Sequence, residues 1–175
     1  MELSLTHCTV RRWRRGDEAS LVEHANNRNI WINLRDRFPH PYTKRDAAHW
    51  MAYVGAAPPD TNFAIDVEGK AAGAIGFVVQ PDVHRISAEI GYWLGEAYWG
   101  RGIMTEALRA VTAFAFQAHG LVRLYAGVFE WNLGSMRVLE KAGYVREGVL
   151  KKSAMKDGRV IDQVLYAVTR ETADG

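Results

Sequence analysis

The sequence predicts a mixed α/β (α+β) fold, in which a mostly antiparallel central sheet carries helices on both faces. Strand and helix signals occur in the order strand, two helices, three strands, helix, strand, helix, two strands. The strand–helix–strand run over 85–129 requires a right-handed crossover, which makes two of the strands parallel. The strands before this crossover are joined by turns and are expected to pair antiparallel.

The first quarter of the chain combines one strand with helical segments. Residues 8–13 (CTVRRW) have strand character. Asp17 follows and predicts the N-cap of a helix over 18–27. The segment 26–43 mixes aromatic, charged and proline residues, so we expect a helical turn or two and then an irregular loop.

Capping and turn residues set the boundaries of the remaining elements. Thr43 and Asp46 form a capping-box pattern at the start of a helix through Tyr53. Asn132 predicts the N-cap of a short helix that Gly143 ends. The remaining strands are expected at 62–67, 72–80, 85–94, 122–129, 144–151 and 160–170, with turns at Gly69 and at Asp157-Gly158.

Composition limits the classes of function. A chain of 175 residues, 48% apolar and 24% charged, fits a single globular domain over 1–175. The net charge of +2 does not require a nucleic-acid or membrane partner, so neither is expected. Cys8 is the sole cysteine, which excludes an intrachain disulfide and fits a reducing, cytoplasmic setting. The six histidines are dispersed without metal-ligand spacing, and no metal is expected.

The stretch GEAYWGRGIMTEALRAV (95–111) places two glycines directly before a segment with helical periodicity. The N-terminus of a helix exposes unpaired N–H groups, and glycine lets an anion approach them closely. Residues Gly100 to Thr105 are therefore expected to bind a phosphate or pyrophosphate, with Arg101 adding charge. The pattern is neither a P-loop nor the dinucleotide fingerprint. A glycine-rich bend that only allows tight helix packing is the alternative.

The stretches AEIGYWLGEAYWGRGIMTEAL (88–108) and NLGSMRVLEKAGYVREGVLK (132–151) together resemble the GNAT (GCN5-related N-acetyltransferase) superfamily. Nearly the whole chain, including RFPHPYTKRDAAHWM (37–51), is similar to the RimJ/RimL branch of ribosomal-protein N-acetyltransferases. The resemblance implies the GNAT acyl-CoA N-acyltransferase fold, with a splayed parallel strand pair. It also implies a cytoplasmic enzyme that transfers the acetyl group of acetyl-CoA to a primary amine by direct attack in a ternary complex.

The resemblance further implies which residues bind coenzyme A. The residues expected at the pyrophosphate are Gly100, Arg101, Gly102, Ile103, Met104 and Thr105. The pantetheine arm is expected along the strand that ends in Trp93 and Leu94, whose backbone N–H groups include the implied oxyanion donor, and Asn132 is a further candidate contact. Trp99 stands where the superfamily has Gln or Arg, and Met104 is bulkier than the usual small residue.

Two side chains are candidates for the chemistry. Glu89 shares a strand face with Trp93 and is the candidate general base, although a structural ion pair with an arginine is the alternative. Ser135, in the first turn after the Asn132 cap, is the candidate group for hydrogen-bonding the leaving thiolate, unless it only caps or packs. RimL-like relatives often carry a glutamate near the position of Ala154, which this chain lacks.

The acceptor is expected to be an amine-bearing molecule, with a protein N-terminal α-amine among the candidates. Its site is expected between the N-terminal helices and the final hairpin, at Leu34, Arg35, Phe38 and Tyr42, with Trp31 and Asp36 nearby. Core or loop packing is the alternative role for the aromatic residues. Two other functions stay open: a catalytically weak CoA-binding regulatory or interaction module, and a structural protein without cofactor. The resemblance also leaves a homodimer open.

Overall fold

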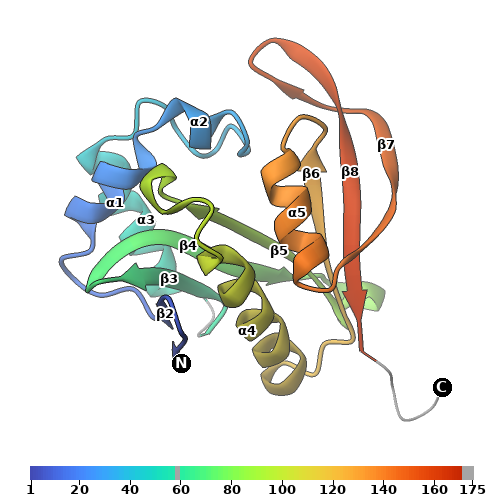
Figure 1. Cartoon of the computed structure of the whole chain (residues 1–175), viewed down its shortest axis with the longest axis horizontal. Helices are drawn as coiled ribbons and strands as arrows, with labels where there is room; N and C mark the ends of the chain where they lie inside the picture. Colours follow the sequence, from blue (N-terminus) through green and yellow to red (C-terminus); the bar gives the residue numbers. More distant parts are fainter. Residues whose placement is uncertain (58–59, 171–175) are drawn as a thin grey trace. The chain divides into compact units, whose positions relative to one another are not determined.

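The computed structural model describes residues 1–57 and 60–170, which group into two compact units. Unit 1 comprises residues 1–76 and 92–107, and unit 2 comprises 77–91 and the described residues from 108 onward. Three elements contribute residues to both units: β4 (Lys70–Val79), β5 (Ser87–Leu94) and α4 (Ile103–Ala118). Figure 1 shows the course of the chain through these elements.

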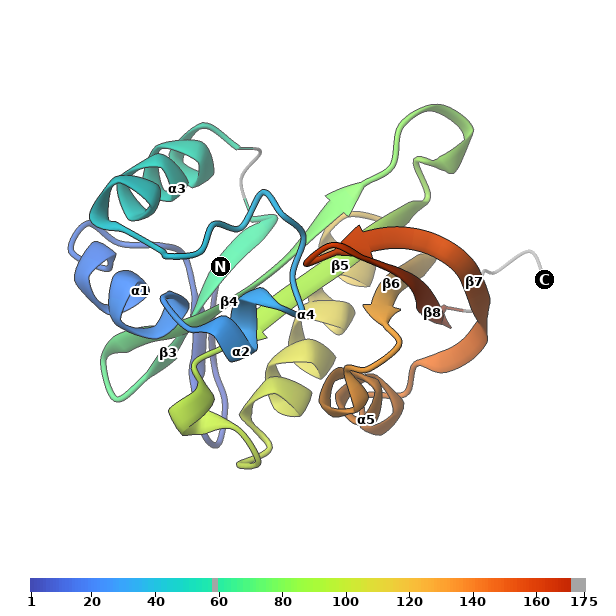
Figure 2. The same cartoon turned by 90° about the horizontal axis from the view of Figure 1, so that it is seen from above.

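Unit 1 combines antiparallel strands with helices. Its strands follow the order β1 (Glu2–Ser4), β2 (Thr9–Arg11), β3 (Asn62–Val67), β4 and the end of β5. Its helices are α1 (Glu18–Ala25), α2 (Arg28–Trp31), α3 (Lys44–Ala56), the 3-10 turn η2 (Glu96–Tyr98) and the first turn of α4. Figure 2 shows α1 and α3 side by side on one face of β3 and β4.

Local signals placed several elements of unit 1 correctly. Thr43 and Asp46 form a complete capping box at the start of α3, as predicted. The predicted hairpin of β3 and β4 is confirmed, and Glu68 and Gly69 form its turn with φ of 55° and 83°. β1, a three-residue strand paired with β2, was not predicted because so short a segment carries no periodicity.

The predicted capping role of Asp17 is wrong in its mechanism. Asp17 occupies the N-cap position of α1, but its side chain makes no capping hydrogen bond. Both carboxylate oxygens instead accept from the guanidinium of Arg11, at 2.8 and 2.9 Å, and one also accepts from the backbone N–H of Arg14. The Nε of Arg11 donates to Asp66 on β3 at 2.6 Å. Arg11 is only 2% exposed, and its buried charge needs carboxylate partners. The Asp17 carboxylate therefore pairs with Arg11 and does not cap the helix.

A hydrophobic cluster packs the helices of unit 1 together. Its buried members are Leu21, Ala25, Tyr42 and Ala47, and the partly buried side chains against it are Trp13, Val22, Phe38, Trp50 and Trp93. The backbone N–H of Tyr42 donates to the side-chain oxygen of Asn26, just after α1, at 3.0 Å. The irregular loop before α3 is thereby attached to the end of α1.

Unit 2 contains the parallel strand pair. Its elements are the end of β4, η1 (Asp82–His84), most of β5, β6 (Arg123–Phe129), α5 (Leu133–Lys141), β7 (Val145–Lys156), β8 (Arg159–Thr169) and the rest of α4. The strand order is β4-β5-β6-β8-β7. β5 runs parallel to β6, whereas β8 pairs antiparallel with both β6 and β7. This mixed, mostly antiparallel arrangement confirms the predicted fold class.

The last hairpin is longer than predicted. Its turn at Asp157 and Gly158 is confirmed, with φ of 50° and 73°. β7 continues past the predicted end at Lys151 because an irregularity between Leu150 and Ala154, with Lys152 at a φ of 50°, interrupts the alternation without ending the pairing. No helix among the described residues is long and apolar enough to cross a membrane.

Replacing Arg11 should destabilise the fold severely. Arg11→Met keeps the apolar stem but leaves Asp17 and Asp66, both nearly buried, without their cation. Breaking a buried pair in this way typically costs about 3–5 kcal/mol of unfolding free energy. Denaturant titration followed by circular dichroism measures the loss. Arg12→Met is the matched control, since Arg12 is exposed and pairs with Asp60 at the surface, and its loss should be much smaller. Equal losses in the two variants would contradict a special role for Arg11.

Candidate active site

The glycine turn of unit 1 has a left-handed backbone at both of its glycines. Gly100 and Gly102 have φ of 76° and 79°, in the left-handed region that favours glycine. α4 begins directly afterwards at Ile103. A Cβ placed on either glycine would meet no atom within 4 Å, so packing against this chain does not require glycine here. The glycines therefore serve the backbone conformation and leave open space beside it.

The bulky Met104 does not fill that space. Ile103 and Met104 are only 3% and 7% exposed, so both side chains are packed in the protein interior. Gly100, Arg101 and Gly102 are exposed, and Thr105 is half-buried. The larger side chain at position 104 is thus accommodated on the interior side of the helix.

The charges around the turn suit an anion. The guanidinium of Arg101 lies over the ring of Tyr98, 5.5 Å from its centroid. Glu106, the acidic residue in the first turn of α4, accepts hydrogen bonds from the backbone N–H groups of Thr6 and His7, at 2.7 and 3.1 Å. Burial opposes its ionisation, but these hydrogen bonds together hold the pKa of Glu106 below its ordinary value. The carboxylate is therefore engaged by the loop between β1 and β2.

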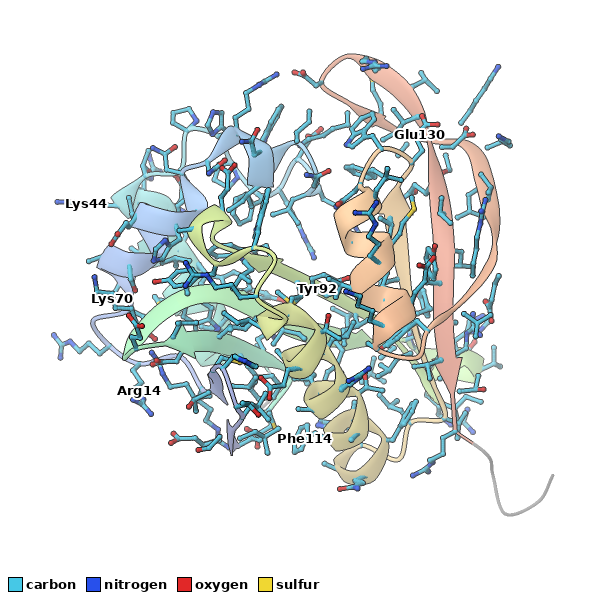
Figure 3. The ribbon with its side chains drawn as sticks, in the orientation of Figure 1. Arg14, Lys44, Lys70, Tyr92, Phe114 and Glu130 are labelled. Atoms are coloured by element: carbon cyan, nitrogen blue, oxygen red, sulfur yellow. The ribbon has the colours of Figure 1, made fainter. Side chains whose placement is uncertain are left out.

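The end of β5 is held tightly against β4. The N–H of Gly95 donates to Ala72 at 2.7 Å, and a Cβ on Gly73 would clash with the carbonyl oxygen of Trp93. Because successive peptide groups of a strand point to opposite edges, the N–H of Leu94 points to the edge away from β4. Tyr92, labelled in Figure 3, precedes these residues on the same strand.

Trp99 has a role that the sequence pattern did not reveal. Its indole N–H donates to the carbonyl oxygen of Leu94 at 2.7 Å, which fastens the glycine turn to the end of β5. The residue that departs from the superfamily pattern therefore closes the loop between the strand and the helix. No local signal predicts this contact, because it depends on how η2 folds back.

The candidate acceptor residues of unit 1 divide into core and surface. Phe38 lies between Trp93 and Tyr42, with ring centroids 5.7 and 5.1 Å away. Tyr42 is 5% exposed within the hydrophobic cluster, and burial first, then Asp46, raises the pKa of its hydroxyl to about 12. Arg35 is exposed and Leu34 is half-buried. Tyr42 thus supports Phe38 from the interior.

In unit 2, Glu89 lies where the parallel pair ends. The register of β5 and β6 runs from Ser87 opposite Arg123 to Glu89 opposite Tyr125. Both strands continue, but within unit 2 their pairing stops at Glu89, which agrees with the expected splay. Arg123 lies over the Tyr125 ring and forms an ion pair with Glu147. Glu89 is half-buried at this point of separation.

Asn132 caps α5 as predicted. Its side-chain oxygen accepts from the backbone N–H of Ser135 at 3.1 Å. Glu130, two residues before Asn132 and labelled in Figure 3, donates its N–H to the carbonyl oxygen of Asp162 at 3.2 Å. The carboxylate of Asp162 in turn accepts from the N–H of Lys152. The start of α5 is thereby tied to the last hairpin.

The structure thus distributes the candidate residues between the units. Unit 1 brings together Phe38, Tyr42, Trp93, Leu94 and the turn from Gly100 to Thr105. Unit 2 contains Glu89, Asn132 and Ser135. Ala154 pairs with Ile161 on β8 and supplies no carboxylate. Within residues 1–57 and 60–170, no group of three or more His, Cys, Asp or Glu side chains is arranged to hold a metal ion.

Comparison with known proteins relates this geometry to an enzyme family. The acetyltransferase (GNAT) domain family matches residues 7–145. The probable N-acetyltransferase YjcK of Bacillus subtilis is 49% identical over 82 residues, which are 47% of this chain and 45% of YjcK. The chain spans about half the length of this and the next curated relatives it matches.

Two further similarities extend over the whole chain. The uncharacterized N-acetyltransferase YnaD of B. subtilis is 34% identical over 175 residues, 98% of each chain. A solved structure of RimL, a ribosomal L7/L12 α-N-protein acetyltransferase in complex with coenzyme A, has a TM-score of 0.84 at 20% identity and covers 97% of this chain and 98% of RimL. The fold, the glycine turn and these matches agree, and the chain belongs to the GNAT acetyltransferase family.

Proposed function

We propose that this protein is an acetyl-CoA-dependent N-acetyltransferase that acts on a primary amine by direct attack in a ternary complex. The glycine turn carries the proposal, because two left-handed glycines and an exposed arginine precede a 16-residue helix. The RimL structure that shares this fold holds coenzyme A, which supports the same ligand here. The family match runs through both units, so we treat residues 1–175 as one acetyltransferase domain.

The residues of the turn fit the pyrophosphate of coenzyme A. The N–H groups from Gly100 to Thr105 would hold it, with charge from Arg101, and the open space beside both glycines leaves room for phosphate oxygens. Asn132 is a further candidate contact. When bound, acetyl-CoA supplies the thioester that the amine attacks. Leu94 is the better oxyanion donor of the two candidates. Its backbone N–H points away from β4, whereas the backbone polar groups of Trp93 face β4.

Glu89 is the proposed general base. It is half-buried, and it lies where the pairing of β5 and β6 stops. In this role it accepts a proton from the acceptor amine, directly or through one water molecule. An α-amino group has an ordinary pKa of about 7.7–8.0, so the demand on the base is moderate.

Ser135 is the proposed partner of the leaving thiolate. We assign its side-chain hydroxyl, in the first turn of α5 beside the Asn132 cap, the role of hydrogen-bond donor to the thiolate. The positive end of α5 adds favourable electrostatics for a developing negative charge. The acceptor itself is proposed to contact Leu34, Arg35 and Phe38, with Tyr42 behind them.

The proposed acceptor is an amine-bearing molecule, with a protein N-terminus as the first candidate because RimL acts on a ribosomal protein. Such an acceptor would place the reaction in the cytoplasm. A catalytically weak CoA-binding module is the second candidate, and Ala154 favours it because no carboxylate stands there. Thiol release from acetyl-CoA with a panel of peptides and small amines separates the two. Stabilisation by about 2.7 kcal/mol at 100-fold the Kd of coenzyme A is expected in both.

Gly102→Ala should weaken coenzyme A binding by about tenfold. Alanine disfavours the left-handed conformation by roughly 1–2 kcal/mol, so the turn would relax and move its N–H groups. Isothermal titration calorimetry with coenzyme A measures the Kd. Gly158→Ala is the matched control, because it carries a similar φ of 73° in the β7–β8 turn. If both variants bind like the parent protein, the turn is not the anion site.

Glu89→Gln should lower kcat by about 100-fold near neutral pH, at the lower end of general-base effects. The deficit should shrink as pH rises, because a growing fraction of the amine is already deprotonated. The pH–rate profile with a peptide acceptor tests this, with the Kd of coenzyme A as the control that should stay unchanged. A constant ratio of the two rates across pH would remove Glu89 as base.

Ser135→Ala should slow acetyl transfer while the stability of α5 is retained, because the backbone N–H still donates to Asn132. Single-turnover rates with acetyl-CoA measure the effect. Asn132→Ala provides the contrast, since it removes the cap and should cost about 1 kcal/mol of stability. Full activity of the serine variant would show that its hydroxyl has no part in the reaction.

A further inference from the structure

Arg101 is held by an aromatic ring and not by a carboxylate. Its guanidinium lies 5.5 Å from the centroid of the Tyr98 ring. In the part of the chain that the structure describes, Arg101 forms no ion pair with an acidic side chain. The positive charge of Arg101 is therefore not neutralised beside Gly100 and Gly102. The orientation of its guanidinium is set by the Tyr98 ring on which it stacks.

The Tyr98 ring is itself fixed by a histidine from α1. His24 meets it edge-on, with centroids 5.4 Å apart and an interplanar angle of 72°. A Cβ placed on Gly95 would lie 3.1 Å from the Nδ1 of His24, so the histidine packs tightly against the start of η2. Among the described residues its buried Nε2 has no hydrogen-bond partner, which indicates that packing, not hydrogen bonding, holds the ring.

The segment that carries Tyr98 is anchored on both sides. The carboxylate of Glu96 accepts from the side-chain amides of Asn27 and Asn29, at 2.6 and 3.0 Å. The backbone N–H of Gly95 donates a hydrogen bond to Ala72 on β4, and the indole N–H of Trp99 donates one to the carbonyl oxygen of Leu94. With η2 tied to both the strand and the α1–α2 junction, the ring of Tyr98 forms a fixed platform.

We propose that Tyr98 and His24 are positioning residues that hold Arg101 ready for the phosphate groups of coenzyme A. The inference rests on the proposed function. A guanidinium already stacked on a ring loses less side-chain freedom on binding a phosphate, so the stack raises affinity without touching the ligand. The stack should act only on a cofactor that carries phosphates and should leave the acetyl transfer step unchanged.

Tyr98→Leu should raise the KM for acetyl-CoA by about two- to fivefold with kcat unchanged, the size expected for an exposed cation–π contact. The KM for acetyl-pantetheine, which lacks phosphates, should not move. Tyr98→Phe is the matched control, because it keeps the ring face and should behave like the parent protein. Arg101→Ala should weaken coenzyme A binding at least as much, and the double variant Tyr98→Leu/Arg101→Ala should be no weaker than Arg101→Ala.

His24→Ala should reproduce part of the Tyr98→Leu effect, and His24→Phe, which restores an aromatic edge, should rescue it. Melting temperatures of all variants exclude unfolding as the cause. Three results would overturn the proposal: additive losses in the double variant, equal losses with acetyl-CoA and acetyl-pantetheine, or a Tyr98→Phe variant as weak as Tyr98→Leu. Failure of the parent protein to bind coenzyme A at all would instead refute the proposed function.

Discussion

The buried guanidinium of Arg11 fixes the start of α1 against β2 and β3, and much of unit 1 depends on it. It engages Asp17 before α1 and Asp66 on β3. Two nearly buried carboxylates without this cation would be very unfavourable, so the pairing determines where α1 begins. From there α1 carries His24 to the ring of Tyr98. An ion cluster far from the glycine turn in sequence thus supports the segment that leads into the turn.

Neighbouring residues of the glycine turn have different roles. Gly100 and Gly102 supply the left-handed backbone, and Arg101 supplies the charge. Trp99 closes the loop onto Leu94, and Met104 turns into the interior. The two departures from the superfamily pattern therefore both have structural explanations. The family assignment therefore holds despite an unusual sequence at this point.

The proposed reacting groups of unit 2 lie where regular hydrogen bonding stops. Glu89 is the last paired residue of the parallel strands, and Ser135 is in the first turn of α5. Strand separation and a helix start both leave peptide groups that are not fully used by their own element. Such positions can present polar groups to a substrate without breaking the fold. Asp162 strengthens one of them by linking the loop before α5 to the last hairpin.

Most element boundaries could be predicted because they depend on neighbours a few residues apart. The Thr43–Asp46 capping box, the Asn132 cap and the Asp157-Gly158 turn each involve residues within three positions of one another. The left-handed glycines of the turn before α4 belong to the same class. Caps and turns of this kind depend on the residue types at a few adjacent positions, and glycine permits a positive φ that other residues disfavour.

The tertiary structure alone decided the contacts between distant segments. The Asp17 carboxylate pairs with Arg11 and makes no capping hydrogen bond. Tyr42, expected at the acceptor site, lies in the hydrophobic cluster. The parallel register that ends at Glu89 and the Trp99 bond to Leu94 were also not encoded in any local pattern. The sequence by itself determined which residues can form turns or cap helices. Which of them meet was decided by burial and charge pairing across the fold, because those energies depend on partners that only the folded chain brings together.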